Sequence, residues 1–159
     1  MDSRISVQRV DPHGEVATAL IGELLAELSR RYADQGDEEA EAASFHPAEA
    51  TVPRSVFLVA TLDGEPVGCG ALRPMTDEAV EIKRMYVREQ ARGHGVGRAI
   101  LAELERLAAQ FGYASMILAT GVRQPEAIAL YTRCGFERME NFGEYVGNAL
   151  SVCMRKDVR

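Results

Sequence analysis

A glycine-rich turn, R-G-H-G-V-G at positions 92–97, lies between a strand-like run and a segment whose apolar residues recur at helical spacing. Unpaired backbone N–H groups meet at the start of a helix, where the positive end of the helix dipole also lies. Glycine lets the backbone approach a ligand closely, and Arg92 and Arg98 can add charge-assisted hydrogen bonds. The turn therefore predicts a phosphate-binding site at the beginning of a helix.

Two common glycine-rich loops do not fit this turn. The dinucleotide pattern G-x-G-x-x-G requires glycine at position 98, where this chain has Arg98. The nucleotide P-loop requires G-K-S or G-K-T, and the turn contains no lysine. Neither a dinucleotide nor a P-loop nucleotide is therefore the expected ligand.

The residues before the turn predict a strand, a helix and an antiparallel meander. Partial apolar alternation favours a first strand at 5–10, and apolar residues recurring every four positions from Val16 to Leu28 favour an amphipathic helix of about 18 residues. The pair Asp63-Gly64 is typical of a tight hairpin. The expected strands of the meander are 56–60, 67–72 and 79–87.

The residues after the turn predict two helices and three more strands. The first helix ends at Gly112, which suits a helix C-cap, and Pro125 suits the start of the second helix, which continues to Cys134. The expected strands are 115–120, 137–142 and 150–155. The order of elements predicts an α/β fold with a mixed sheet.

Charge and composition narrow the function classes. With 159 residues, of which 47% are hydrophobic, we expect one domain spanning 1–159. Residues 1–80 carry 15 acidic and 6 basic side chains (−9), and residues 81–159 carry 9 and 12 (+3), which sum to the net charge of −6. This split argues against a nucleic-acid partner and leaves room for a locally positive site that receives a polyanion.

We expect no metal, no membrane association and a cytoplasmic location. The three cysteines and three histidines are scattered without the spacing of a zinc site or a disulfide framework. No apolar run reaches the roughly 20 residues of a membrane-spanning helix, and the first residues lack the layout of a signal peptide. The sequence leaves open whether two copies associate as a homodimer.

Two motifs give the chain a specific resemblance. Residues 80–87 (V-E-I-K-R-M-Y-V), followed by R-x-x-G-x-G at 92–97 and a helix, look like motif A of the GNAT superfamily of N-acetyltransferases. Residues 124–136 read Q-x-x-A-x-x-L-Y-x-x-x-G-F, which is similar to motif B of that family, with glutamine where asparagine is common. The resemblance implies the GNAT-like acyl-CoA N-acyltransferase fold, a mixed sheet of about seven strands flanked by helices.

The resemblance also implies a cofactor and its site. Acetyl-coenzyme A would place its pyrophosphate on the N–H groups of residues 93–98, and its pantetheine arm would bond to the backbone of Met85 and Val87. Such pairing needs a strand that splays from its neighbour, often at a bulge. The Met85 N–H would polarise the thioester carbonyl. The implied cofactor-binding residues are Met85, Tyr86, Val87, Arg92, Gly93, His94, Gly95, Val96, Gly97, Arg98 and Gln124.

Two residues are candidates for proton transfer. An amine must lose a proton to attack a thioester, and Glu81 lies 11 residues before Arg92, the spacing at which histone-type relatives carry a catalytic glutamate. Tyr131 matches the family tyrosine that protonates the departing thiolate. The competing interpretations are an ion-paired Glu81 on a sheet face and a Tyr131 that only packs in the core. For His94 we expect proximity to phosphate rather than base catalysis.

The acceptor is the least determined part of the prediction. The acidic first half favours a cationic amine, whereas a set of basic residues could anchor an acceptor carboxylate: Arg73, Lys83, Arg84 and Arg123. We favour a small amine or amino-acid-like acceptor. The alternatives are a protein lysine or N-terminus, and a non-catalytic sensor of acetyl-coenzyme A. The acidic stretch 34–53 is either a solvated loop or a lid over the acceptor.

Overall fold

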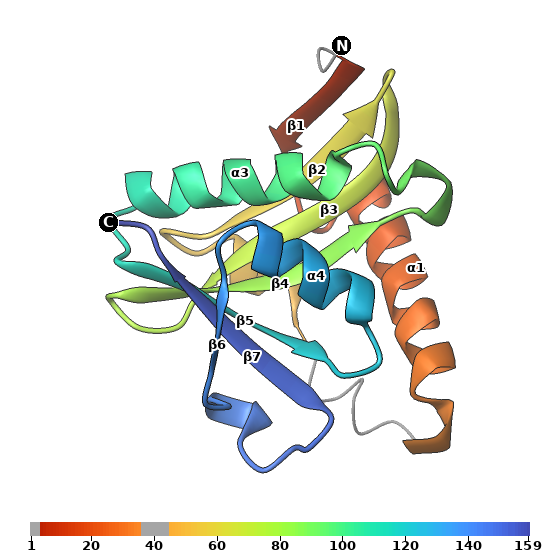
Figure 1. Cartoon of the computed structure of the whole chain (residues 1–159). Coiled ribbons are helices and arrows are strands. Elements are labelled where there is room, and N and C mark those ends of the chain that lie inside the picture. Colours follow the sequence, from red (N-terminus) through yellow and green to blue (C-terminus); the bar gives the residue numbers. More distant parts are fainter. Residues whose placement is uncertain (1–3, 36–44) are drawn as a thin grey trace.

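The computed structural model describes residues 4–35 and 45–159, and within them a seven-stranded mixed sheet carries helices on both faces (Figure 1). The strands are β1 (Ile5–Arg9), β2 (Val56–Leu62), β3 (Glu65–Pro74), β4 (Ala79–Val87), β5 (Ser115–Gly121), β6 (Glu137–Met139) and β7 (Ser151–Asp157). The helices are α1 (Glu15–Arg31), α3 (Val96–Gln110) and α4 (Pro125–Arg133), with short 3₁₀ turns at Ala33–Gln35, Pro47–Ala50, Glu89–Ala91 and Gly143–Tyr145. The α/β class and the mixed sheet are confirmed.

The strands follow the order β1-β2-β3-β4-β5-β7-β6. All neighbours are antiparallel except β4 and β5, which α3 joins as a parallel pair. The hairpin between β2 and β3 turns at Asp63 (φ 53°) and Gly64 (φ 85°). A two-residue turn with positive φ at both positions matches the twist of the flanking strands, which is why Asp-Gly marks this hairpin in the sequence.

Strands β4 and β5 separate halfway along their length. Ala79–Ile82 pair with Ser115–Leu118, and both strands then continue beyond the last paired residues, to Val87 and Gly121. On its other side β4 has a bulge against β3, where the pairing shifts between Cys69 and Ala71, and Arg84 has φ 58°. The expected splayed strand with a bulge is therefore present, and it opens a gap in the sheet beside Arg84–Val87.

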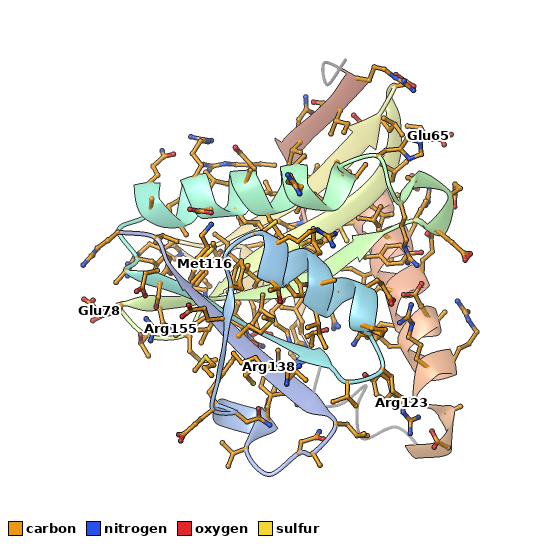
Figure 2. All side chains as sticks on the ribbon, viewed as in Figure 1. Glu65, Glu78, Met116, Arg123, Arg138 and Arg155 are labelled. Atoms are coloured by element: carbon orange, nitrogen blue, oxygen red, sulfur yellow. The ribbon has the colours of Figure 1, made fainter. Side chains whose placement is uncertain are left out.

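Helices α1 and α3 cover opposite faces of the sheet. Because side chains alternate along a strand, Leu58 of β2 packs in one cluster with Ile100 of α3, and Phe57 packs in the other with Leu20 of α1. Side chains fill the space between helix and sheet, and Met116 of β5 is fully buried in the α3 cluster (Figure 2).

Helix α3 approaches β3 closely because β3 carries Gly70 at the contact. A Cβ atom at this position would lie 2.9 Å from Cγ2 of Ile100 and 2.8 Å from Sδ of Met85. Glycine inside a strand commonly marks such an approach. Because α3 packs closely on β3, the glycine turn that precedes α3 is held near the end of β4.

The segment expected as a strand at 137–142 is strand only at Glu137–Met139. The side-chain amide of Asn141 donates to the backbone oxygens of Tyr145 and Asn148, each at 3.1 Å, and these bonds hold the following residues in a compact loop. Local side-chain bonds of this kind compete with strand pairing. The loop carries the 3₁₀ turn at Gly143–Tyr145, which delivers Tyr145 to the site described below.

The expected connection at 34–53 is partly outside the described residues. Its described part contains the 3₁₀ turns at Ala33–Gln35 and Pro47–Ala50, and residues 36–44 are not described. None of the described helices is long and apolar enough to cross a membrane.

Candidate active site

The glycine turn forms one wall of a cavity of about 580 Å³. Gly93 (φ 83°) and Gly95 (φ 86°) have left-handed backbones, and a Cβ added at either would meet no atom within 4 Å. Gly95 is the N-cap of α3, so the unpaired N–H groups of the first helical turn start at this wall. The open space beside left-handed glycines at a helix N-terminus fits a phosphate-bearing ligand.

The structure brings all eleven predicted cofactor-binding residues to this one cavity. They come from β4, from the glycine turn, from the first turn of α3 and from the residue before α4. The residues are Met85, Tyr86, Val87, Arg92, Gly93, His94, Gly95, Val96, Gly97, Arg98 and Gln124.

Two cationic side chains of the cavity are available for phosphate, and a third is engaged. Arg98 and Arg133 line the cavity without an ion pair or hydrogen bond to any residue that the structure describes, and both are exposed. Arg92 instead donates from Nε to the Val87 oxygen at 2.8 Å and from Nη2 to Glu27 at 2.7 Å. Arg92 therefore ties the turn to β4 and α1.

Gly97 also lies where α3 packs against α4. A Cβ at Gly97 would lie 2.9 Å from Cδ2 of Leu130 and 3.8 Å from Cγ2 of Val87. The missing side chain lets α3 pack closely against α4.

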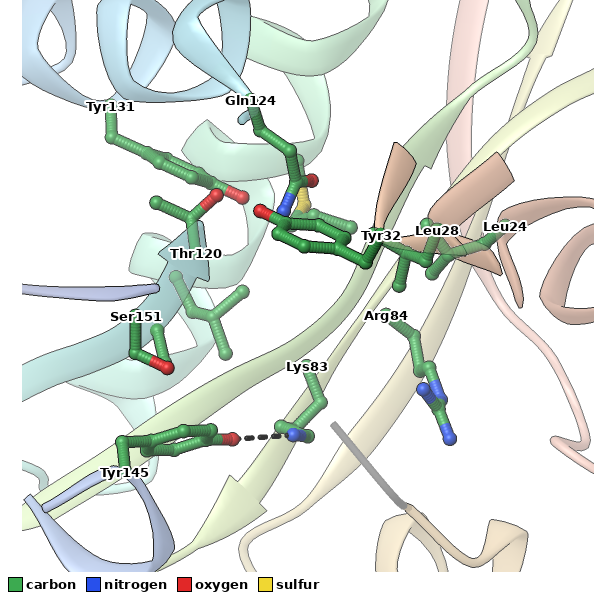
Figure 3. A pocket seen from close by; sticks show the side chains of 13 residues that line it. Leu24, Leu28, Tyr32, Lys83, Arg84, Thr120, Gln124, Tyr131, Tyr145 and Ser151 are labelled. Atoms are coloured by element: carbon green, nitrogen blue, oxygen red, sulfur yellow. Dashed lines mark hydrogen bonds between the residues drawn. The ribbon is translucent and has the colours of Figure 1, made fainter. Parts of the chain in front are cut away.

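A second, smaller pocket of about 90 Å³ adjoins the first at the gap between β4 and β5 (Figure 3). Leu24, Met85, Gln124 and Tyr131 line both spaces. The residues that line only the smaller pocket come from α1, β4, β5 and the segment 145–151: Leu28, Tyr32, Ile82, Lys83, Arg84, Ala119, Thr120, Tyr145 and Ser151. A ligand in the large cavity and a ligand in the small pocket would thus meet beside Met85 and Tyr131.

The model of the acetyltransferase (GNAT) family matches residues 19–136, which include both cavity-forming motifs. The chain belongs to the GNAT acetyltransferase family. It is therefore an acyltransferase, as its relatives are.

The relatives cover most of the chain. It is 34% identical over 153 residues to an IAA acetyltransferase from Azospirillum brasilense, which spans 96% of this chain and 97% of the relative. It is 36% identical over 106 residues to human N-acetylaspartate synthetase, covering 65% of this chain and 35% of that protein. A GNAT family acetyltransferase from Elizabethkingia anophelis, solved with acetyl-CoA bound, has the same fold, with a TM-score of 0.68 at 21% identity over 97% and 98% of the two chains.

Tyr131 of this GNAT chain lies where the two spaces meet. It is 6% exposed, and its ring packs edge-on against Phe136 with centroids 5.8 Å apart. Burial raises the pKa of Tyr131, so its phenol holds its proton at neutral pH. Both earlier interpretations of Tyr131 therefore have a structural basis, since it packs in the core and also faces the site.

Glu81 is set back from both spaces. Its side chain is fully buried, its Oε1 accepts hydrogen bonds from Nε (3.2 Å) and Nη2 of Arg73, and its Oε2 accepts from the Tyr145 hydroxyl at 3.1 Å. Glu81 lines neither the large cavity nor the small pocket. Tyr145 lines the small pocket and donates a hydrogen bond to Glu81, so its hydroxyl offers a path for protons between Glu81 and a ligand.

Lys83 connects the small pocket to this carboxylate. Its side chain is 6% exposed, and its ammonium donates to the Tyr145 hydroxyl at 2.8 Å (Figure 3) and lies 3.9 Å from Glu81 Oε2. Burial lowers the pKa of Lys83 to about 8, although Glu81 opposes this shift. The three groups form a hydrogen-bonded chain, Lys83 to Tyr145 to Glu81, that begins at the pocket wall.

Sequence reasoning missed two tyrosines of the small pocket. Tyr145 follows a loop near the end of the chain, and Tyr32 is the C-cap of α1, where its hydroxyl accepts from the Arg123 N–H at 3.3 Å. No motif marks either residue. Arg123, expected as a possible acceptor anchor, pairs with Asp34 and lines neither space.

His94 lies in the exposed part of the turn and lines only the large cavity. Its Nδ1 is 3.1 Å from the Arg92 oxygen. This position agrees with proximity to phosphate. Among the described residues, no three His, Cys, Asp or Glu side chains are grouped as a metal site requires.

We expect Gly95→Val to weaken acetyl-CoA binding at least about tenfold, because a branched side chain resists φ 86° and projects into the cavity. The measurement is calorimetric titration of the folded variant. Gly64→Val is the matched control, since Gly64 has φ 85° and open space but lies in the β2–β3 hairpin. Equal affinity losses in the two variants would contradict a phosphate site at Gly95.

We expect Arg92→Ala to lower the free energy of unfolding by about 2 kcal/mol, because it removes two partly buried charge-assisted hydrogen bonds. Arg92→Ala should also weaken acetyl-CoA binding, and the size of this affinity loss should change little with salt concentration. Arg98→Ala should instead leave stability unchanged and weaken binding most at low ionic strength. Chemical denaturation and titrations at two salt concentrations test this contrast, and the reverse pattern would contradict it.

Proposed function

We propose that this GNAT chain transfers the acetyl group of acetyl-coenzyme A to the primary amine of a small molecule, by direct attack in a ternary complex. One observation carries the proposal: the cavity formed by the glycine turn and the small pocket share Met85 and Tyr131. Two ligands can occupy these spaces together and meet there. Direct transfer requires that arrangement, because no covalent enzyme intermediate then intervenes.

The residues of the large cavity fit the cofactor. Two left-handed glycines leave room for phosphate, and Arg98 and Arg133 add positive charge at the cavity wall. When bound, acetyl-coenzyme A would supply the acetyl thioester. The splayed part of β4 would bind the pantetheine arm, and the Met85 N–H would donate to the thioester carbonyl oxygen.

The residues of the small pocket would manage the protons of the acceptor amine. The Tyr145 oxygen would accept a proton from the acceptor nitrogen while its O–H passes one to Oε2 of Glu81. The nitrogen would then bond to the acetyl carbon as the carbon–sulfur bond breaks. Tyr131 would donate its phenolic proton to the departing sulfur and recover one from the acetylated nitrogen through water.

The relatives support a small acceptor. The name N-acetylaspartate synthetase, carried by the human relative, denotes acetylation of a single amino acid, and the bacterial relative that spans nearly the whole chain is named an IAA acetyltransferase. The pocket volume of about 90 Å³ also suits a few non-hydrogen atoms better than a long side chain with its peptide.

The test is an acceptor screen with detection of free coenzyme A thiol and of the acetylated product by mass spectrometry. The panel contains free amino acids, simple alkyl amines, polyamines and peptides with a lysine or a free N-terminus. We expect thiol release with at least one small amine. Acetylation of peptides alone would favour a protein acetyltransferase, and tight acetyl-CoA binding without any transfer would favour a sensor.

A further inference from the structure

The small pocket contains two cationic side chains that the large cavity does not. Lys83 and Arg84 are 7% and 8% exposed, and both line the small pocket only. Consecutive strand residues normally point to opposite faces. The bulge at Arg84, with its φ of 58°, allows both side chains to reach the same pocket.

No carboxylate lines this pocket among the residues that the structure describes. The carboxylates near Lys83 lie behind the wall and already have partners. Glu81 is shared between Arg73 and Lys83, while Glu49 and Glu144 both face Arg73. The described lining that an acceptor would touch therefore carries two cations with hydroxyl and amide groups around them, and one of these cations, Arg84, also donates to the Phe45 oxygen at 3.3 Å.

A positive, largely buried wall discriminates between acceptors by charge. A second ammonium group on the acceptor would lose hydration beside two cations, and no carboxylate in the described lining would pair with it. A carboxylate would replace its water with charge-assisted hydrogen bonds from Lys83 and Arg84. The wall thus favours an acceptor whose amine is accompanied by a negative group.

We infer that the acceptor is an amino acid whose carboxylate is bound by Lys83 and Arg84 while its amine faces the thioester beside Met85. This inference rests on the proposed function and names the substrate class of the same site. Lys83 and Met85 both line the small pocket, so the carboxylate and the amine of one small molecule can reach them together.

The protonation of Lys83 gives the inference an independent signature. With its pKa held near 8, Lys83 is partly neutral at pH 8, and a bound carboxylate would favour its charged form. Acceptor binding at pH 8 should therefore take up protons. The charged and titratable groups that face Lys83 are Glu81 and Arg84 on β4, Arg73 on β3, and Glu144 and Tyr145 in the 3₁₀ turn.

The experiment compares matched acceptors that differ only in the negative group. For each amino acid accepted in the screen, kcat/KM is measured for the free acid, its carboxamide and the amine without the carboxyl group. We expect the acid to be preferred at least about tenfold over both, mainly through KM. Equal or better use of the carboxamide or amine would overturn the inference and leave the proposed acetyl transfer intact.

Two variants test whether the preference for the free acid arises from the small pocket. In Lys83→Met the ratio of acid to carboxamide should fall by about 10- to 100-fold, the loss expected for a charged hydrogen bond, and calorimetry in two buffers should show the proton uptake lost. Arg98→Met is the matched control, because it removes a cation from the large cavity. Circular dichroism and thermal unfolding establish that each variant is folded.

The outcomes separate the two proposals. An unchanged ratio in Lys83→Met, or a ratio that falls equally in Arg98→Met, would overturn the assignment of the carboxylate to Lys83 and Arg84. Absence of transfer to every acceptor by a protein that binds acetyl-CoA would overturn the proposed function, and the acceptor class with it.

Discussion

Tyr131→Phe should lower turnover by about 10²- to 10⁴-fold while leaving acetyl-CoA affinity nearly unchanged, because we propose that the phenol, which lines the large cavity, protonates the departing sulfur. The ring and its edge-on contact with Phe136 remain in the variant, so packing changes little. The loss should persist at high pH, because deprotonating the acceptor amine does not replace the missing acid. A pH–rate profile with saturating acetyl-CoA measures both features.

Phe136→Leu is the matched control for Tyr131, since it alters the same aromatic contact without touching the phenol. We expect it to lower stability and to change turnover much less than Tyr131→Phe. Wild-type turnover in Tyr131→Phe would assign Tyr131 to the core alone, and sulfur would then leave without a protein acid.

Glu81→Gln should also lower turnover by about 10²- to 10⁴-fold near neutral pH, with partial recovery as pH rises. An α-amino group has a pKa of about 8, so raising pH through this value supplies more neutral amine from solution and reduces the need for a base. The variant should also be less stable by up to about 3 kcal/mol, since Arg73 loses its buried partner Glu81 and keeps only the more exposed Glu49 and Glu144.

Tyr145→Phe separates catalysis from stability at Glu81. This variant keeps the pair of Glu81 and Arg73 but removes the hydroxyl through which Glu81 contacts the pocket. If Glu81 acts as the base, Tyr145→Phe should reproduce the pH-dependent loss of turnover. Full activity in Tyr145→Phe, together with an unstable Glu81→Gln, would leave Glu81 as a buried structural ion pair.

The fold and the residues around the large cavity could be predicted because their signals are local. The glycine turn and the Asp63-Gly64 hairpin depend on positive φ angles that few residues adopt, and the ring of Pro125 fixes φ at a value suited to the first helical position. The predicted cofactor residues come from short segments, so fixing the strand, turn and helix around Gly95 brings most of them together.

The small pocket could not be predicted in the same way because it is built from distant segments. Tyr145 meets Glu81 across 64 residues of sequence, through a loop whose path depends on the side chain of Asn141. The alternation of side chains along β4 predicts that Glu81 and Lys83 share one face of the sheet. It does not predict which of the two the loop that carries Tyr145 covers. The sequence therefore identified Glu81 as a candidate without its burial or its dependence on Tyr145.

Strand β7 has a consequence for how the chain folds. It lies between β5 and β6, yet residues 151–157 leave the ribosome after both of its neighbours. Until then β5 presents an unpaired edge during synthesis, and exposed strand edges promote aggregation. The meander β1 to β4 and α3 can assemble early from contacts between neighbouring segments, whereas the part of the sheet beside the small pocket is completed last. A protein shortened before Ser151 would retain the glycine turn and lose the strand that closes the sheet.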